Sequence, residues 1–259
     1  MSETVRPWPP LANVADGAWH GCTVGPLVIR VRRMDDEWHA VCDRDEESEK
    51  ATEPPTWQPV DAPDEGVEIK RWLVGDPLPL AIVPAMPDRP VVVRPAAPLI
   101  LMPGASGSFF VSIPVWVRFG IEADGSLRQL HEFPTVVLSN TWYGTPFDGI
   151  LAYALRTLAH RALENLLPRR HRAICAIEIV NRWAEPVLLE RLCIHAENLA
   201  IYAGTTRLWT TAVRCILKNP AEPSVIEFAD APPDGRGAGG LITPARSPQR
   251  SGLLRWMRG

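Results

Sequence analysis

The sequence lacks the features that would assign it to several common functional classes. Its charges nearly balance, with 27 Lys and Arg against 30 Asp and Glu and a formal net charge of −3 at pH 7, which argues against nucleic-acid binding by bulk charge attraction. It contains neither a phosphate-binding loop of the G-x-x-x-x-G-K-[ST] type nor a G-x-G-x-x-G dinucleotide motif. The segment Gly104-Ala105-Ser106-Gly107 is no nucleophile elbow, because its glycines have the wrong spacing around the serine. None of these familiar catalytic or nucleotide-binding motifs therefore occurs in the sequence.

The N-terminus and the cysteines lack the marks of a secreted protein. The first residues, MSETVRPWPPLANVADG, contain no apolar leader segment, so we predict a cytoplasmic location. Cysteine is scarce, and the five residues form an odd, scattered set, which fits reduced thiols better than a disulfide framework. No residue pattern predicts a bound cofactor.

One run of 23 residues, PAAPLILMPGASGSFFVSIPVWV (95–117), lacks any charge. A membrane-spanning helix needs about 20 apolar residues, but this run contains four prolines, each of which costs a helix about 3 kcal/mol. Apolar residues instead alternate from Phe109 through the end of the run to Ile121, as in a strand with one buried face. We therefore predict no transmembrane segment but a buried β-hairpin with a turn at 103–107 and Pro114 at an edge or bulge.

The rest of the chain also has the composition of an all-β protein. It has 27 prolines and few segments of helical period. We predict a β-sandwich or jelly-roll-like fold, or two stacked sandwiches, over 18–230, after an irregular lead-in at 1–17 and with a candidate subdivision near 122–126. The acidic segment 43–67 predicts a mobile loop or an insertion between strands, and the Pro-, Gly- and Arg-rich segment 231–259 predicts a disordered tail.

Three further segments carry specific structural predictions. Residues 149–167 fit both a strand and a helix, and we favour a strand to about Thr157 followed by a short helical or irregular turn. The segment AICAIEIVNRWAEPVLLERLCIHA (173–196) predicts a hairpin with its turn at 181–186. The basic run 169–172 predicts a solvated turn, since four residues make a small footprint for lipid or nucleic acid.

Four residues near the N-terminus have the right chemistry for a zinc site. His20 and Cys22 lie two apart, so they share a face of a strand, whereas His39 and Cys42 lie three apart and point to opposite faces. We therefore reject the metal site. We expect Cys42 to pack as a small core residue and both histidines to lie at the surface.

Trp142 and Tyr143 are the first candidate binding residues. They precede a proline-containing loop, and aromatic side chains at the rim of a sheet can stack on sugars or contact a protein partner. For Trp142 we favour the alternative, a core anchor packed with Val136 and Leu138, which share its parity along the strand.

The C-terminus carries the second set of candidate binding residues. In a helical turn, Leu253, Leu254 and Met257 would form an apolar face beside Trp256. A segment this short is not a stable isolated helix. The alternatives are a short docking peptide that orders on binding and a frayed terminus.

Four stretches resemble an uncharacterised family of bacterial and archaeal proteins of unknown function. They lie within 19–220 and read GPLVIRVRRMDDEWHAV, FFVSIPVWV, SNTWYGTPFDGILAYALRT and HRAICAIEIVNRWAEPVLLERLCIHAENLAIYAGTTRLWTTAV. Ile150 and Ala152 depart from the family pattern, which has an acidic residue and a cysteine at these places. The resemblance implies no known activity and no catalytic motif. It does imply a membrane-protein partner, because family members have mechanosensitive channels as neighbours.

Three functions follow as expectations from the sequence. The first is a non-catalytic cytoplasmic interaction protein, which binds a protein partner such as a membrane channel by its sheet rim or its tail. The second is a module that binds a small molecule or carbohydrate, which would show a pocket lined by Trp142 or Tyr143. The third is a metal-dependent enzyme, which would gather titratable side chains in one place.

Overall fold

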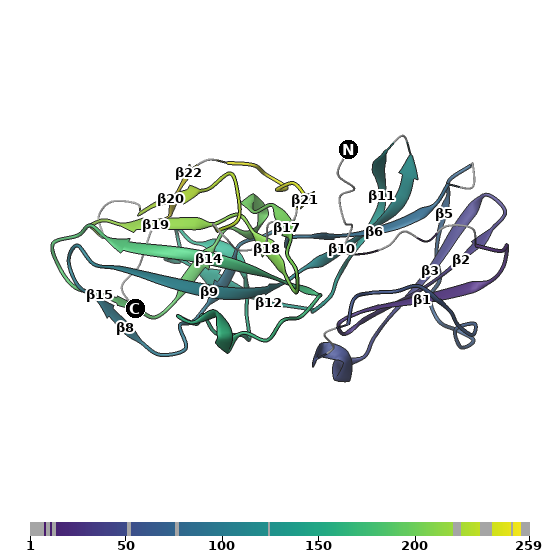
Figure 1. Cartoon of the computed structure of the whole chain (residues 1–259), viewed down its shortest axis with the longest axis horizontal. Coiled ribbons are helices and arrows are strands. Elements are labelled where there is room, and N and C mark those ends of the chain that lie inside the picture. The colour runs from purple at the N-terminus through teal and green to yellow at the C-terminus, as the bar shows by residue number, and fades with distance from the viewer. Residues whose placement is uncertain are drawn as a thin grey trace. The chain divides into compact units, whose positions relative to one another are not determined.

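The computed structural model describes a chain built almost entirely from β-strands (Figure 1). Within the described residues there are 22 strands, three short 3-10 helices and no α-helix, which confirms the predicted all-β class. None of the helices there has the length and apolar character to cross a membrane. The residues described are 8, 11, 14–50, 53–75, 78–123, 125–219, 224–233, 240–249 and 251–254.

The chain forms two compact units that share it in alternating pieces. The first unit takes the described parts of 1–85, 115–136 and 169–171, and the second takes those of 86–114, 137–168 and 172–259. The chain therefore passes between the units several times, rather than at a single boundary near 122–126. Each unit contains more than one sheet, and their arrangement as sandwiches stays a prediction.

The first unit contains two sheets. One has the strand order β4-β1-β2-β3-β5 and the other β11-β10-β6. Trp72 of β5 contacts Phe119 of β10 with ring centroids 5.2 Å apart, so apolar side chains of the two sheets meet in one core. The elements are β1 Trp19–Val24, β2 Leu27–Met34, β3 Glu37–Arg44, η1 Glu46–Lys50, β4 Gln58–Pro59, β5 Lys70–Leu73, β6 Leu80–Ala85, β10 Trp116–Ala123 and β11 Ser126–Pro134.

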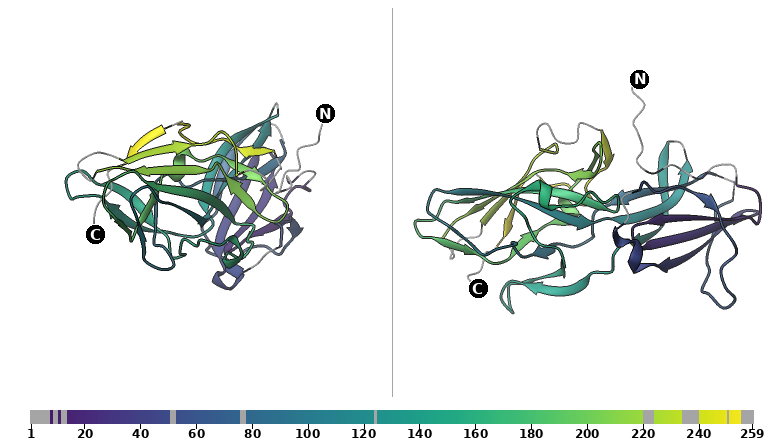
Figure 2. Two further views of the ribbon diagram at one scale, coloured as in Figure 1. Left: turned by 60° about the vertical axis from the view of Figure 1, so that its left-hand side comes forward. Right: turned by 60° about the horizontal axis from the view of Figure 1, so that its bottom comes forward.

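The second unit is built around β14, the ten-residue strand Arg172–Asn181. One side of β14 pairs along its length with β9, and the other side pairs with β18 and then β19; Figures 1 and 2 show β9 and β14 running side by side. Two smaller sheets have the orders β12-β13-β7-β16 and β15-β8. The other elements are β7 Val91–Val93, β8 Leu99–Leu101, β9 Ser106–Pro114, β12 Ser139–Tyr143, β13 Ile150–Ala154, η2 Leu163–Asn165, β15 Val187–Leu189, β16 Leu192–Ile194, η3 Ala196–Asn198, β17 Ile201–Ala203, β18 Leu208–Thr210, β19 Val213–Leu217, β20 Ser224–Phe228, β21 Leu241–Thr243 and β22 Ser251–Leu254.

The uncharged run forms strands, as predicted, but not a hairpin. Every apolar residue of the alternating set over 109–121 is buried. However, β8 pairs with β15 and β9 with β14, so the two strands flanking the turn do not pair with each other. The chain also leaves one unit for the other after Pro114, the last residue of β9. The long alternation is thus divided between β9 and β10.

The segment 173–196 is likewise not the hairpin that its sequence predicts. It forms β14, β15 and β16, of which β15 pairs with β8 and β16 with β7. The predicted strand and short turn over 149–167 do appear, as β13 and η2. In the acidic loop 43–67, the structure describes η1 and the two-residue strand β4, which pairs with β1.

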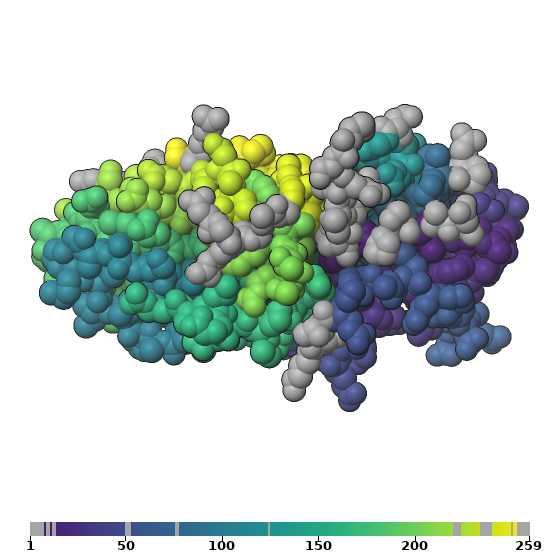
Figure 3. All heavy atoms as spheres, in the orientation of Figure 1, coloured from purple at the N-terminus to yellow at the C-terminus, as the bar shows by residue number. Residues whose placement is uncertain are grey.

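Two strands lie in the region predicted to be a disordered tail. β21 pairs with β17 and β22 pairs with β20, and in Figure 3 the yellow atoms of this region lie against green atoms of the same unit. Edge strands form by backbone pairing, which a composition poor in large apolar residues does not prevent. Leu253 and Leu254 belong to β22, so the predicted helical turn does not form there, and Trp256 and Met257 lie outside the described residues.

Candidate functional site

The β12–β13 hairpin carries the predicted aromatic pair and points its two members in opposite directions. Trp142 pairs with Leu151, and these side chains are 46% and 44% exposed. Tyr143 is buried on the other face, at 7% exposure. The expectation that Trp142 anchors the core is therefore wrong, since its neighbour Tyr143 does so instead.

Tyr143 fixes the hairpin to the unit. The Arg191 guanidinium lies 5.4 Å from the centre of the Tyr143 ring, and Arg191 Nη2 donates to the backbone oxygen of Trp142 at 2.9 Å. Burial is the main cause that raises the pKa of the Tyr143 hydroxyl far above its ordinary value, so this side chain stays neutral.

The loop between the two strands is held in one conformation by its own side chains. Trp142 Nε1 donates to the carbonyl oxygen of Thr145 at 2.8 Å, and the Asp148 amide donates to Thr145 Oγ1 at 3.0 Å. The Trp142 indole lies so close to Gly149 that a Cβ there would overlap it. At the tip stands Phe147, which is 96% exposed. Sequence reasoning missed Phe147, although its place after Pro146 in a tight loop was a usable signal.

Beside Trp142, on the same face of the hairpin, lies a small polar network. Tyr153 Oη donates to Asp88 Oδ1 at 2.9 Å, and Arg89 Nη1 donates to Asn140 Oδ1 at 3.4 Å. The Arg89 guanidinium lies 5.4 Å from the centre of the Tyr153 ring. Asn140 pairs with Tyr153, two residues along the strand from Trp142 and therefore on the same face. Polar groups thus flank the exposed Trp142 indole.

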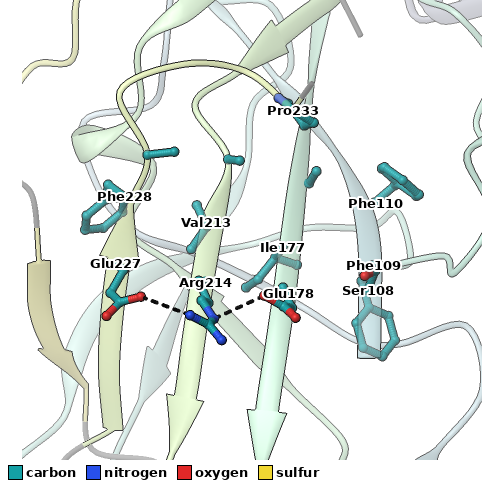
Figure 4. Close-up of a pocket in the computed structure, with 13 residues that line it drawn as sticks. Ser108, Phe109, Phe110, Ile177, Glu178, Val213, Arg214, Glu227, Phe228 and Pro233 are labelled. Carbon is teal, nitrogen blue, oxygen red and sulfur yellow. Dashed lines mark ion pairs between the residues drawn. The ribbon is translucent and has the colours of Figure 1, made fainter. Parts of the chain in front are cut away.

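A second feature is a hollow of about 510 Å³ on the face of the large sheet that carries Glu178 (Figure 4). Its floor consists of Ala176, Ala212 and Ala229, and we call it the alanine hollow. Alternation along β14 turns Ala176 and Glu178 to this face, while Ile177 and Ile179 face the core. The alternation in the sequence indicated that Glu178 points away from the core. It did not indicate which charged side chains of other strands would lie next to Glu178.

A row of charges borders the alanine hollow. Arg214 Nε lies 3.1 Å from Glu178 Oε2, and Arg214 Nη1 lies 3.9 Å from Glu227 Oε2, the two pairs drawn as dashed lines in Figure 4. All three side chains are nearly half exposed. Two carboxylates share one guanidinium, so the row carries a net charge of −1.

The four residues of the rejected zinc site lie on β1 and β3 of the first unit. Cys22 and Cys42 both pair with Ile29 of the strand between them, and His39 turns to the opposite face from Cys42. His39 is buried rather than at the surface. Both ring nitrogens have partners there, since Arg32 Nε donates to Nδ1 at 3.2 Å and Nε2 lies 2.7 Å from Glu37 Oε2. In the part of the chain that the structure describes, no three His, Cys, Asp or Glu side chains gather as a metal site would require.

The basic run is not the predicted solvated turn. Arg169 forms an ion pair with Glu49 at 2.9 Å, His171 is fully buried, and Arg172 Nη1 donates to the Ser112 carbonyl at 3.3 Å. These residues lie where the chain crosses between the units, a role that the local composition does not reveal.

The thiols are held in their neutral form. Burial raises the pKa of Cys22, Cys175 and Cys215 to about 12 and that of Cys42 to about 11. Since the thiolate is the nucleophile, the native protein is expected to react with a disulfide reagent such as DTNB at pH 8 about 100-fold more slowly than the unfolded chain. Absorbance of the released thionitrobenzoate, with and without denaturant, measures this. Rapid stoichiometric reaction of the native protein would contradict it.

No curated protein and no solved structure matches the chain. A family model described as "Protein of unknown function (DUF432)" matches residues 12–257, which cover both units. The chain therefore belongs to the DUF432 family of proteins of unknown function.

Proposed function

We propose that the protein is a non-catalytic cytoplasmic binding protein that contacts a protein partner through the tip of its β12–β13 hairpin. The observation that supports this proposal is Phe147, 96% exposed on a loop fixed by the hydrogen bonds of Trp142 and Thr145. A large aromatic group on an ordered loop loses little conformational entropy on binding. Aromatic side chains that enter a pocket of the partner are also typical binding hot spots.

The charge within the hairpin segment itself favours a protein over a lipid surface. From Val137 to Leu155 the sequence has one acidic residue, Asp148, and no Lys or Arg. Segments that bind anionic membranes gather basic residues next to their apolar ones. A protein pocket therefore suits this tip better, and the neighbours of the resembling family make a membrane channel the first partner to test. We favour the hairpin over the C-terminal tail because β22 is already paired with β20.

A second candidate function is carbohydrate binding at the face of the same hairpin. Its support is the exposed Trp142 with Asn140, Asp88, Arg89 and Tyr153 beside it. Sugar sites combine an aromatic platform with polar side chains that make hydrogen bonds. The two candidates differ in the essential residue, which is Phe147 for the protein partner and Trp142 for the sugar.

Photo-crosslinking at the hairpin tip tests the first candidate. A benzoylphenylalanine placed at position 147 in cells that naturally make the protein is expected to yield one discrete crosslinked protein, identified by mass spectrometry. Excess wild-type protein should suppress that product, whereas the Phe147→Ala protein should not, because aromatic truncation at a hot spot costs about 2 kcal/mol or more. Phe147→Ala should leave thermal stability within about 0.5 kcal/mol, since the side chain is almost fully exposed.

The matched control is the same photoreactive group at Ile100, an apolar side chain 60% exposed on β8 of the same unit. The same products at both positions, or none at position 147, would refute the hairpin-tip proposal. A change in tryptophan fluorescence with oligosaccharides that is lost in Trp142→Phe, without a crosslink at 147, would favour the carbohydrate function instead.

A further inference from the structure

We infer that the alanine hollow is a binding site for a small amphiphilic organic cation, an amine or guanidine with an aromatic or aliphatic body. The site lies on the outward face of the large sheet and does not depend on the partner-binding role of the hairpin. It combines an apolar floor, fixed walls and a charged border of net negative sign.

The floor is low because short side chains follow one another across neighbouring strands. Phe110 pairs with Ala176, and the backbone of Ala229 donates to the Ala212 carbonyl at 2.9 Å. Three alanines therefore lie side by side across neighbouring strands: Ala176 in β14, Ala212 just before β19 and Ala229 just after β20. Phe110 of β9 lies at the end of this row. Three methyl groups beside larger neighbours leave apolar space open above the sheet.

One end of the hollow is closed by a small apolar cluster. Phe110, which lines the hollow, packs against the buried residues Leu166, Ile174 and Trp209. Ile174 lies two residues before Ala176 on β14, so it faces the same side of the sheet. The apolar body of a ligand would meet Phe110 and this cluster as its wall.

A turn of chain after β20 forms another wall and is tied down by hydrogen bonds. The Ala212 amide donates to the Ala231 carbonyl at 3.1 Å, and Tyr202 Oη donates to the Asp230 carbonyl at 2.9 Å. Pro233, at the end of this turn, lines the hollow (Figure 4). The walls therefore exist before a ligand arrives, which lowers the entropy cost of binding.

The open border selects the charge of the ligand. Of the described residues that line the hollow, Arg214 is the one cation, and Glu178 and Glu227 are the two anions. A ligand cation at this border would restore a balance of two positive and two negative charges, whereas an anion would add to the excess. The row lies two residues from the alanine floor, about 7 Å along the strand, so a ligand with its charge a few bonds from its apolar body reaches both.

The dimensions favour a small molecule over a peptide segment. A volume of about 510 Å³ lies within the range of ligand sites, roughly 300–1,000 Å³. An extended peptide would have to continue past the cluster of Leu166, Ile174 and Trp209, which closes that end. A free small cation needs no such exit.

Three probes of the same skeleton and different charge test this inference on the full chain: 4-phenylbutylamine, 4-phenylbutan-1-ol and 4-phenylbutyrate. Titrations followed by the methyl signals of alanine-labelled protein should show the amine binding with a Kd of about 1 mM and shifting the signals of Ala176, Ala212 and Ala229. At low ionic strength the amine should bind about fivefold tighter than the alcohol, and added salt should reduce this ratio.

Charge variants supply the decisive comparison. In Glu178→Gln/Glu227→Gln the border carries only Arg214, so the preference should reverse and the carboxylate should bind tighter than the amine. Ala176→Leu fills the floor and should weaken all three probes at least tenfold. Glu190→Gln, which removes an exposed carboxylate elsewhere in the same unit, should change nothing.

Three outcomes would overturn the inference: no shift of the floor alanines with any probe, equal affinity for amine and carboxylate, or no reversal in the double glutamine variant. If Ala176→Leu fails to fold, the double glutamine variant still decides the question, since its side chains are nearly half exposed. A failure at the hairpin tip leaves every one of these results unaffected.

Discussion

Replacement of Gly25 by alanine is expected to lower the free energy of unfolding by about 3 kcal/mol or more. Gly25 lies between β1 and β2 with φ +59°, a left-handed conformation that costs other residues about 1–2 kcal/mol. A Cβ there would also overlap the imidazole of His171, which is fully buried and cannot move into solvent. Urea unfolding followed by tryptophan fluorescence measures the loss.

A double-mutant cycle with His171→Ala separates the two causes. If the overlap with the ring dominates, Gly25→Ala should cost only about 1–2 kcal/mol in the His171→Ala background, which is the cost of the left-handed backbone conformation alone. An equal cost in both backgrounds would show that the imidazole does not restrict this turn. Gly66→Ala is a matched control, since Gly66 also has positive φ (88°) but has open space around its Cβ position.

The second large effect is expected at Asn181, where replacement by leucine should cost about 4 kcal/mol. Asn181 is fully buried at the end of β14. Its Nδ2 donates to the carbonyl oxygens of Leu101 and Glu185, each at 2.9 Å, and its Oδ1 accepts from the Trp183 amide at 2.9 Å. Leucine has nearly the same volume but no polar group, so three backbone groups would lose their hydrogen-bond partner. Each loss costs roughly 1–3 kcal/mol, and hydrogen bonds to entering water would reduce the total.

The matched control for Asn181 is the same substitution at Asn140, which is exposed and makes one side-chain hydrogen bond of 3.4 Å. Asn140→Leu should change stability by about 0.5 kcal/mol or less. Equal effects at both positions would mean that the buried hydrogen bonds of Asn181 contribute little. Because Asn181 links the turn before β9 to the turn after β14, its loss should also raise hydrogen exchange at Gly104, whose amide donates to the Asn181 carbonyl at 2.9 Å.

Local sequence patterns predicted the strands well, because buried and exposed side chains alternate at every second residue of a strand. The alternation over 109–121 marked buried side chains correctly. Segment 149–167, whose apolar spacing fits both a strand and a helix, also forms the predicted strand and short helical turn, β13 and η2. Each of these predictions needs only the side chains of one segment.

Strand partners could not be predicted, because they depend on segments far away in the chain. β14 has neighbours from 106–114, 208–210 and 213–217, none of which follows it through a tight turn. The same limit applies to the candidate sites. Glu178, Arg214 and Glu227 come from three strands and form a row only after pairing, and parity alone did not tell which of Trp142 and Tyr143 faces the core.

The division of the chain between two units has a consequence for its synthesis. The first unit uses residues up to 85, then 115–136, and finally 169–171. That last piece contains His171, whose imidazole packs closely against Gly25. A nascent chain emerging from the ribosome therefore carries an unfinished first unit until well over half of the protein has been translated. No single cut in the gene releases either unit intact, so the two can be gained or lost only together.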